Sequence, residues 1–115
     1  MPSSHEIVWL GDIALIYCRG RIVAGETDAL RDVLLRAIQS TGKVVLHLAS
    51  VTHMDSTGLG LLAYLCAAAR RRSGDLKLVA PSSQLKKILA VTMVGQIFDI
   101  YPTEEAASSA FLTAK

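Results

Sequence analysis

Three adjacent polar residues, Asp55, Ser56 and Thr57, stand immediately before a long apolar stretch that contains Gly58 and Gly60. Aspartate, serine and threonine side chains accept hydrogen bonds from the free N–H groups of a helix's first turn, so they favour a helix start here. Such a start also attracts anions through those N–H groups and the helix dipole. A phosphoryl group on Ser56 would bring about −1.5 to −2 charges without breaking the helix. Two interpretations stay open: a structural cap on a buried helix, or a site regulated by phosphorylation.

Other chemistry in this segment has weaker support. His53, Asp55 and Ser56 have the composition of a nucleophilic triad, but neighbouring side chains point in different directions. The sequence contains no Gly-x-Ser-x-Gly elbow, and Gly58 with Gly60 does not complete a dinucleotide-binding fingerprint. We therefore expect no catalytic residues, no enzyme activity and no cofactor.

Cysteine and histidine are too few and too scattered for a disulfide framework or a metal centre. Cys18 and Cys66 both lie in apolar surroundings, which predicts two buried thiols that act as small hydrophobic residues. The three histidines, His5, His47 and His53, lack the spacing of metal ligands. We expect no metal site.

Length and composition predict one globular domain over residues 1–115. Hydrophobic residues make up 51% of the chain and charged residues 19%, which argues against disorder. The net charge of +2 is too small to indicate a nucleic-acid partner. The longest uncharged run, residues 56–69, has 14 residues, whereas a helix needs about 20 to cross a bilayer. The N-terminus also lacks signal-peptide character, so we expect a cytoplasmic protein that does not insert into a membrane.

Hydrophobic periodicity alternates between strand and helix along the chain. The predicted elements are, in order, a hairpin of residues 6–10 and 13–18, a helix that follows Gly25 and ends near Thr41, a strand at 44–48, a polar loop at 50–55, a mostly buried helix at 56–72, a strand at 76–80, a helix from 81 to about 95, a strand at 97–101 and a helix that begins at Thr103. This order, ββαβαβαβα, predicts an α/β domain with helices packed on a mixed, mostly buried sheet.

Residues 53–62, with the sequence HMDSTGLGLL, resemble the signature of STAS domains, specifically that of bacterial anti-sigma factor antagonists. The resemblance extends along nearly the whole chain. The other matching segments are residues 20–23, 74–79, 89–98 and 101–106. The resemblance implies a single STAS-like domain and a protein that binds other proteins rather than an enzyme.

The resemblance also implies a switch that frees a sigma factor for transcription. In this family the unphosphorylated antagonist binds an anti-sigma factor, which is often also a serine kinase. Phosphorylation of the serine after the signature aspartate releases the antagonist, and a phosphatase resets it. The matching phosphoacceptor is Ser56, with Thr57 as the second candidate. The expected partner-binding residues are Asp55, Ser56, Thr57, Gly58, Leu59, Glu26, Thr27 and Asp28.

The same resemblance leaves a second function open. STAS domains also serve as docking subunits of stress-sensing scaffolds and of lipid-transport ATPase complexes, where Ser56 would be only a helix cap. In both cases the simplest expectation is a monomer that forms hetero-complexes.

Overall fold

The computed structural model describes residues 4–113. At the first and last of these residues, Ser4 and Thr113, it describes the backbone only. Strands and helices alternate after an N-terminal hairpin, as the sequence predicts. The elements are β1 (Ser4–Leu10), β2 (Ile13–Ile22), α1 (Asp28–Ser40), β3 (Lys43–Met54), α2 (Ser56–Arg71), β4 (Asp75–Val79), α3 (Ser83–Val91), the 3₁₀ helix η1 (Val94–Ile97), β5 (Ile100–Tyr101) and α4 (Glu104–Thr113).

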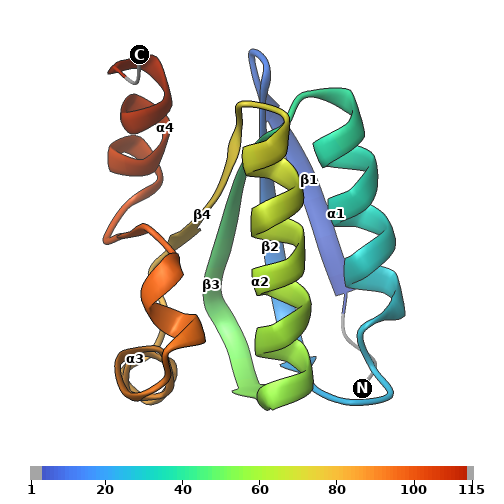
Figure 1. Ribbon diagram of the computed structural model, residues 1–115, viewed down its shortest axis with the longest axis vertical. Coiled ribbons are helices and arrows are strands. Elements are labelled where there is room, and N and C mark those ends of the chain that lie inside the picture. The colour runs from blue at the N-terminus through green and yellow to red at the C-terminus, as the bar shows by residue number, and fades with distance from the viewer. Residues whose placement is uncertain (1–3, 114–115) are drawn as a thin grey trace.

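The five strands form one mixed sheet in the order β1-β2-β3-β4-β5. β1 and β2 are antiparallel, and every later neighbouring pair is parallel. Because parallel crossovers are almost always right-handed, successive crossovers that move in one direction place their helices on the same face of the sheet. Figure 1 shows α1 and α2 side by side over one face, and the mixed α/β fold is confirmed.

The core has two parts because the sheet is covered on both faces. Along β3, Val44 and Leu46 belong to the large cluster under α1 and α2, whereas Val45 points to the other face, where it packs with Ala107 of α4. All four are less than 2% exposed, so the central strands are buried on both faces.

The start of α4 is as predicted from the sequence, since Thr103 Oγ1 accepts a hydrogen bond of 3.1 Å from the Ala106 N–H.

Both cysteines are buried free thiols, as the sequence predicts. Cys18 lies on β2 and Cys66 on α2, and both belong to the larger core cluster. Burial raises the pKa of both thiols. Each therefore stays protonated and packs as a small hydrophobic residue.

β3 is much longer than the sequence predicts. Residues 50–54, expected in a loop, continue the strand and pair with the end of β2, where Gly20 lies opposite Val51 and Ile22 opposite Met54. Irregularities in the ladder break the simple alternation of apolar and polar residues there. Sequence periodicity therefore missed this extension, which carries the chain from the core to the start of α2.

Two further predictions need correction. α2 is buried on one side only: Tyr64 is 63% exposed, and the outer face consists mainly of small apolar residues, which a sequence cannot distinguish from core residues.

The strand predicted at 97–101 is shorter in the structure, where β5 has only Ile100 and Tyr101. The 3₁₀ helix η1 includes Ile97, and Phe98 turns into the core. Within residues 4–113, no helix is long and apolar enough to cross a membrane.

Candidate functional site

Asp55 connects two segments that are far apart in the sequence. It is the N-cap of α2, and its Oδ1 accepts a hydrogen bond of 2.9 Å from the Gly58 N–H. Its Oδ2 accepts another, also of 2.9 Å, from the Ala24 N–H in the loop after β2. Hydrogen bonds from the Ala24 and Gly58 amides lower the pKa of Asp55, because they stabilise the charged carboxylate. The predicted helix cap is present, and it also positions the β2–α1 loop.

Gly58 lets the start of α2 approach the end of β2. A Cβ atom built on Gly58 would lie 2.0 Å from the Ile22 carbonyl oxygen, a distance no real side chain tolerates. The same carbonyl accepts a hydrogen bond of 3.3 Å from the Asp55 N–H. The backbone of β2 therefore fixes the position of the α2 start, and glycine is required at position 58.

The side chains that follow Asp55 divide into an exposed pair and a buried pair. Ser56 and Thr57 are exposed on the first turn of α2. Gly58 is buried against β2, and Leu59 is 5% exposed in the core. Of the signature residues expected to bind a partner, only the two hydroxyl side chains and part of Asp55 are therefore accessible.

The loop between β2 and α1 lies beside this helix start. Glu26 forms an ion pair with Arg21 at 3.3 Å, and Asp28 forms one with Arg31 at 3.2 Å. Glu26 and Asp28 are exposed and Thr27 is partly exposed. The hydrogen bond from the Ala24 N–H to Asp55 therefore holds the segment that carries Glu26, Thr27 and Asp28 beside the signature.

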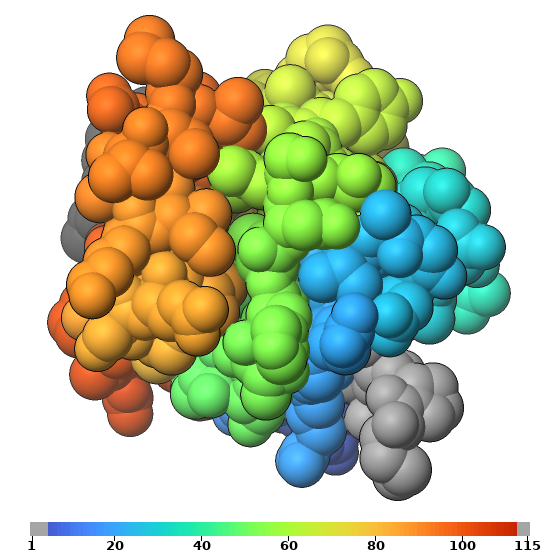
Figure 2. Space-filling model, turned by 90° about the horizontal axis from the view of Figure 1, so that it is seen from below, coloured from blue at the N-terminus to red at the C-terminus, as the bar shows by residue number. Residues whose placement is uncertain are grey.

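Figure 2 looks onto this end of the molecule. The green junction of β3 and α2 lies between the blue end of β2 with its loop and the orange segment that contains α3 and η1. The three segments form one continuous surface at the carboxyl ends of the parallel strands. A partner that contacts Ser56 can therefore contact the β2–α1 loop at the same time.

Three residues at this surface were not among the predicted site residues. Thr52 Oγ1 donates a hydrogen bond of 3.1 Å to the Gly20 carbonyl, and the His53 Nδ1 lies 2.9 Å from Thr52 Oγ1. Both side chains are exposed on the extension of β3. Ala24 contributes only its backbone N–H, so its residue type gives no signal in the sequence. The extended β3 pairing would have pointed to Thr52 and His53.

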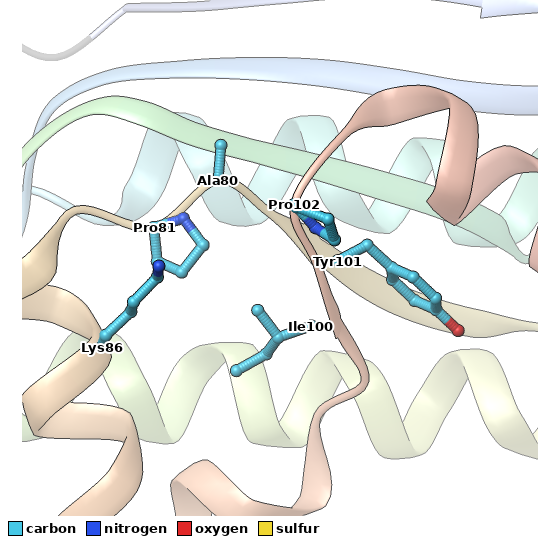
Figure 3. Close-up of a pocket in the computed structure, with 6 residues that line it drawn as sticks. All are labelled: Ala80, Pro81, Lys86, Ile100, Tyr101 and Pro102. Atoms are coloured by element: carbon cyan, nitrogen blue, oxygen red, sulfur yellow. The ribbon is translucent and has the colours of Figure 1, made fainter.

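A shallow hollow of about 470 Å³ lies away from this junction, at the ends of β4 and β5 (Figure 3). Its lining residues are Ala80, Pro81, Lys86, Ile100, Tyr101 and Pro102. Lys86 is the only charged residue among them, and the Tyr101 ring turns away from the other labelled side chains. The polar residues of the signature are absent from it, so the candidate site is the surface at the β3–α2 junction.

The fold and the site together define a small mixed-sheet α/β domain that exposes a serine and a threonine behind an aspartate helix cap. The model of the family described as the STAS domain matches residues 6–107. The chain belongs to the STAS domain family.

Two relatives of known name are anti-sigma factor antagonists. The chain is 31% identical over 88 residues to the anti-sigma-B factor antagonist of Bacillus subtilis strain 168, covering 72% of this chain and 81% of that protein. It is 27% identical over 99 residues to the anti-sigma-F factor antagonist RsfA of Mycobacterium tuberculosis strain H37Rv, covering 84% and 77% respectively.

The fold is also similar to that of SpoIIAA, an anti-sigma factor antagonist whose structure is known in two forms. The unphosphorylated form matches with a TM-score of 0.74 and 17% identity, over 96% of this chain and all of that one. The phosphorylated form, described as a Bacillus cell fate determinant, matches with a TM-score of 0.71 and 18% identity, over 93% and 99%. At this identity the likeness concerns the fold alone.

Proposed function

We propose that the protein is an anti-sigma factor antagonist controlled by phosphorylation of Ser56. The exposure of Ser56 directly after the Asp55 cap is the observation that carries this proposal. The names of its relatives in Bacillus and Mycobacterium support it. The proposed partner is an anti-sigma factor with serine kinase activity, and binding to it releases a sigma factor.

In the unphosphorylated state, the binding surface consists of the α2 start and the β2–α1 loop. Ser56 and Thr57 present hydroxyl groups, and Glu26 and Asp28, each paired with an arginine, present charged side chains at the edge of the same surface. Charged pairs that complement those of a partner fix the orientation of the complex. The buried Gly58 and Leu59 support this surface from within the domain.

The kinase would transfer the γ-phosphoryl group of ATP to Ser56 Oγ. The new P–O bond replaces the bond to the β-phosphate, the hydroxyl proton is lost, and ADP leaves. A phosphatase would return the serine by hydrolysis, with release of inorganic phosphate. Thr57 is the second candidate acceptor because it is exposed in the same turn.

The phosphate would act by charge rather than by refolding the domain. Asp55 is held by two backbone N–H groups and Gly58 by the close approach to β2, so the start of α2 is fixed. About −1.5 to −2 charges on Ser56 would add to the carboxylate of Asp55. A partner surface that accepts a neutral hydroxyl is then faced with a bulky anion, which disfavours the complex. The match of both SpoIIAA forms to one fold supports this view.

A charge-substitution experiment tests the proposal. We expect Ser56→Asp to lower capture of the anti-sigma kinase from the source cell's lysate at least about tenfold, which corresponds to about 1.4 kcal/mol, whereas Ser56→Ala should retain capture. Ser40→Asp is the control: Ser40 is the exposed last residue of α1, which ends just before the start of β3 and so at the opposite end of the sheet from Ser56. It adds the same charge away from the proposed binding surface and should leave capture unchanged.

A phosphorylation assay separates the switch from simple docking. The captured kinase with ATP and Mg²⁺ should label wild type and Thr57→Ala but not Ser56→Ala, as read by phosphopeptide mass spectrometry. Capture of scaffold or transporter proteins equally by wild type and Ser56→Asp, with Ser56 unlabelled, would instead support the docking-subunit alternative and contradict the switch.

A further inference from the structure

β1 is the longer of the two edge strands of the sheet. β1 has seven residues and pairs only with β2, so within residues 4–113 nothing pairs with its other edge. The opposite edge strand, β5, has only two residues. Natural proteins protect long edges with lysine, proline, bulges or covering segments, because an open edge invites another strand. β1 contains neither lysine nor proline, and its ladder with β2 is regular.

The hairpin turn determines which backbone groups of β1 face outward. Leu10 pairs with Ile13 across the two-residue turn of Gly11 and Asp12, and Gly11 has a φ of +61°. In a two-residue hairpin the residues that flank the turn form a hydrogen-bonded pair, and such pairs then alternate along the ladder. Leu10 and every second residue before it therefore bond to β2. The N–H and C=O groups of the odd-numbered residues point to the free edge.

We propose that this edge pairs with β1 of a second copy of the chain, in an antiparallel, two-fold symmetric contact centred on Ile7. A two-fold axis normal to the sheet passes through one opposed pair, so the central residue must face itself. Ile7 is the middle of the three outward-bonding residues His5, Ile7 and Trp9. Centring the axis there pairs all three in each copy and forms about six backbone hydrogen bonds.

The side chains on the edge are compatible with this register. Ile7 packs against the cluster beneath α1, so His5 and Trp9 lie on the same face by the two-residue period of a strand. Around the axis, Ile7 would face Ile7 of the second copy, and His5 would face its Trp9. Trp9, the only tryptophan of the chain, is 49% exposed in the single copy. The exposed Trp9 ring is the part of this pair that gains contact, because both ring nitrogens of His5 are already buried in the single copy.

A second copy fits this edge better than an unrelated strand because the edge complements itself. On the other face of β1, Val8 is 38% exposed and the only charged side chain of the strand is Glu6. In the proposed register Glu6 faces Val8 of the second copy, so no like charges stand directly opposite one another. The contact would join two five-stranded sheets into one of ten strands. The proposal departs from the monomer expected from the sequence, because the sequence does not reveal which strand is left at an edge.

The proposed contact is independent of the Ser56 switch. β1 is separated from β3 by β2, so pairing at its outer edge leaves the β3–α2 junction uncovered. Sedimentation equilibrium over a wide concentration range should show wild type passing from 12.3 kDa to twice that mass. A chain that stays at 12.3 kDa at its highest soluble concentration would overturn the proposal.

Two variants test the edge without relying on one substitution. Ile7→Pro removes an N–H that points to the free edge, and an edge strand tolerates proline at such a position. Ile7→Val is its control because it keeps that N–H. Trp9→Lys adds a charge to an exposed position of the edge. We expect Ile7→Pro and Trp9→Lys to raise the dimer dissociation constant at least tenfold, with circular dichroism unchanged, and Ile7→Val to stay close to wild type. Dimerisation of both variants as in wild type would contradict the proposal.

Cross-linking tests the register. Opposed α-carbons of a hydrogen-bonded pair lie about 5.5 Å apart, so Ile7→Cys should form a covalent dimer with a short thiol-bridging reagent. Trp9→Cys alone should not, because two Trp9 positions would be offset by four residues, or about 14 Å. A mixture of differently tagged His5→Cys and Trp9→Cys chains should link to each other. The buried native thiols do not compete. Failure of Ile7→Cys to cross-link in a dimeric sample would overturn the register.

Discussion

The two ends of α2 are built from similar parts but differ in their electrostatics. Near its start, a Cβ on Gly58 would lie 2.0 Å from a carbonyl oxygen of β2; just beyond its end, a Cβ on Gly74 would lie 2.0 Å from the Gly42 carbonyl oxygen. An aspartate that accepts backbone hydrogen bonds stands at each place, Asp55 before the helix and Asp75 after it. Backbone contact thus fixes both ends in the same way.

Cations surround Asp75. Arg70 Nε donates to its Oδ1 at 2.8 Å and Lys77 Nζ to its Oδ2 at 3.0 Å, while Lys77 also lies 3.4 Å from Asp99. Burial alone would raise the pKa of Asp75, but the hydrogen bonds from Lys77 and Arg70 outweigh it and lower the pKa. The Lys77 side chain is 8% exposed and its Nζ lies 4.9 Å from the centre of the Phe111 ring. This end balances its charges internally.

Asp55 has backbone donors instead of cations. Its carboxylate accepts from Ala24 and Gly58, and no ion pair among residues 4–113 involves it. Its negative charge, and any charge added at Ser56, is therefore directed to the surface. The glycine contacts therefore fix the path of the chain at both ends of α2, whereas, of the two aspartates, only Asp75 has its carboxylate paired with cations.

A side chain that fills the close contact at the start of α2 should destabilise the protein more than any other change considered for α2. Gly58→Ala should lower the free energy of unfolding by at least about 3 kcal/mol. The new Cβ would collide with the Ile22 carbonyl, which is a backbone group and cannot rotate away as the end of a flexible side chain can. Gly74→Ala should have a similar effect, since its contact is equally close. Urea denaturation of the two variants measures this. A wild-type midpoint for either variant would show that the backbone there relaxes freely.

Lys77→Met tests the balanced end. Removing the cation leaves Asp75 buried with Arg70 alone, so we expect a loss of about 3 kcal/mol in urea denaturation. The double variant Lys77→Met with Asp75→Asn should recover part of this loss, because removing both charges avoids an uncompensated carboxylate. If the double variant were as unstable as the sum of the single ones, the balance of charge would not explain the stability of this end.

The contrast also explains what sequence reasoning could predict. The Asp55 cap and the start of α2 follow from neighbouring residues, so local pattern was sufficient to place them. The extension of β3 depends on pairing with β2 through an irregular ladder, which no local pattern encodes. The bond from Ala24 to Asp55 uses a backbone N–H and is likewise invisible to residue type. Local capping was predictable, whereas the contact that assembles the surface was not.

Burial of the signature residues illustrates the same limit. Asp55 to Leu59 form one continuous motif, but the structure divides it into exposed hydroxyls and a buried glycine and leucine. That division depends on which side of α2 faces the sheet. The apolar composition of α2 predicted a mostly buried helix, but the small residues on its outer face are exposed or half-buried and Tyr64 is exposed.

The charge of Asp55 should make the stability of the protein depend on pH. Hydrogen bonds from Ala24 and Gly58 lower its folded-state pKa, so its contribution to stability is complete above about pH 4 and is lost as the pH falls through that lowered value. Asp55→Asn should therefore lower the melting temperature at neutral pH, and the difference from wild type should shrink on acidification. Thermal unfolding at a series of pH values checks this. A difference that is the same at every pH would mean that the charge of Asp55 does not contribute.

Substitution of Gly60, two residues beyond Gly58, should have a small effect of the opposite sign. A Cβ on Gly60 would meet nothing within 4 Å, and this residue is exposed on α2. Gly60→Ala should raise the free energy of unfolding by about 0.5–1 kcal/mol, because alanine restricts the unfolded chain and favours the helix. Urea denaturation beside Gly58→Ala measures both. Changes of opposite sign in the free energy of unfolding at these two glycines would show that glycine is required at position 58 by the contact with β2 and not by helix propensity. Destabilisation by both substitutions would refute that explanation.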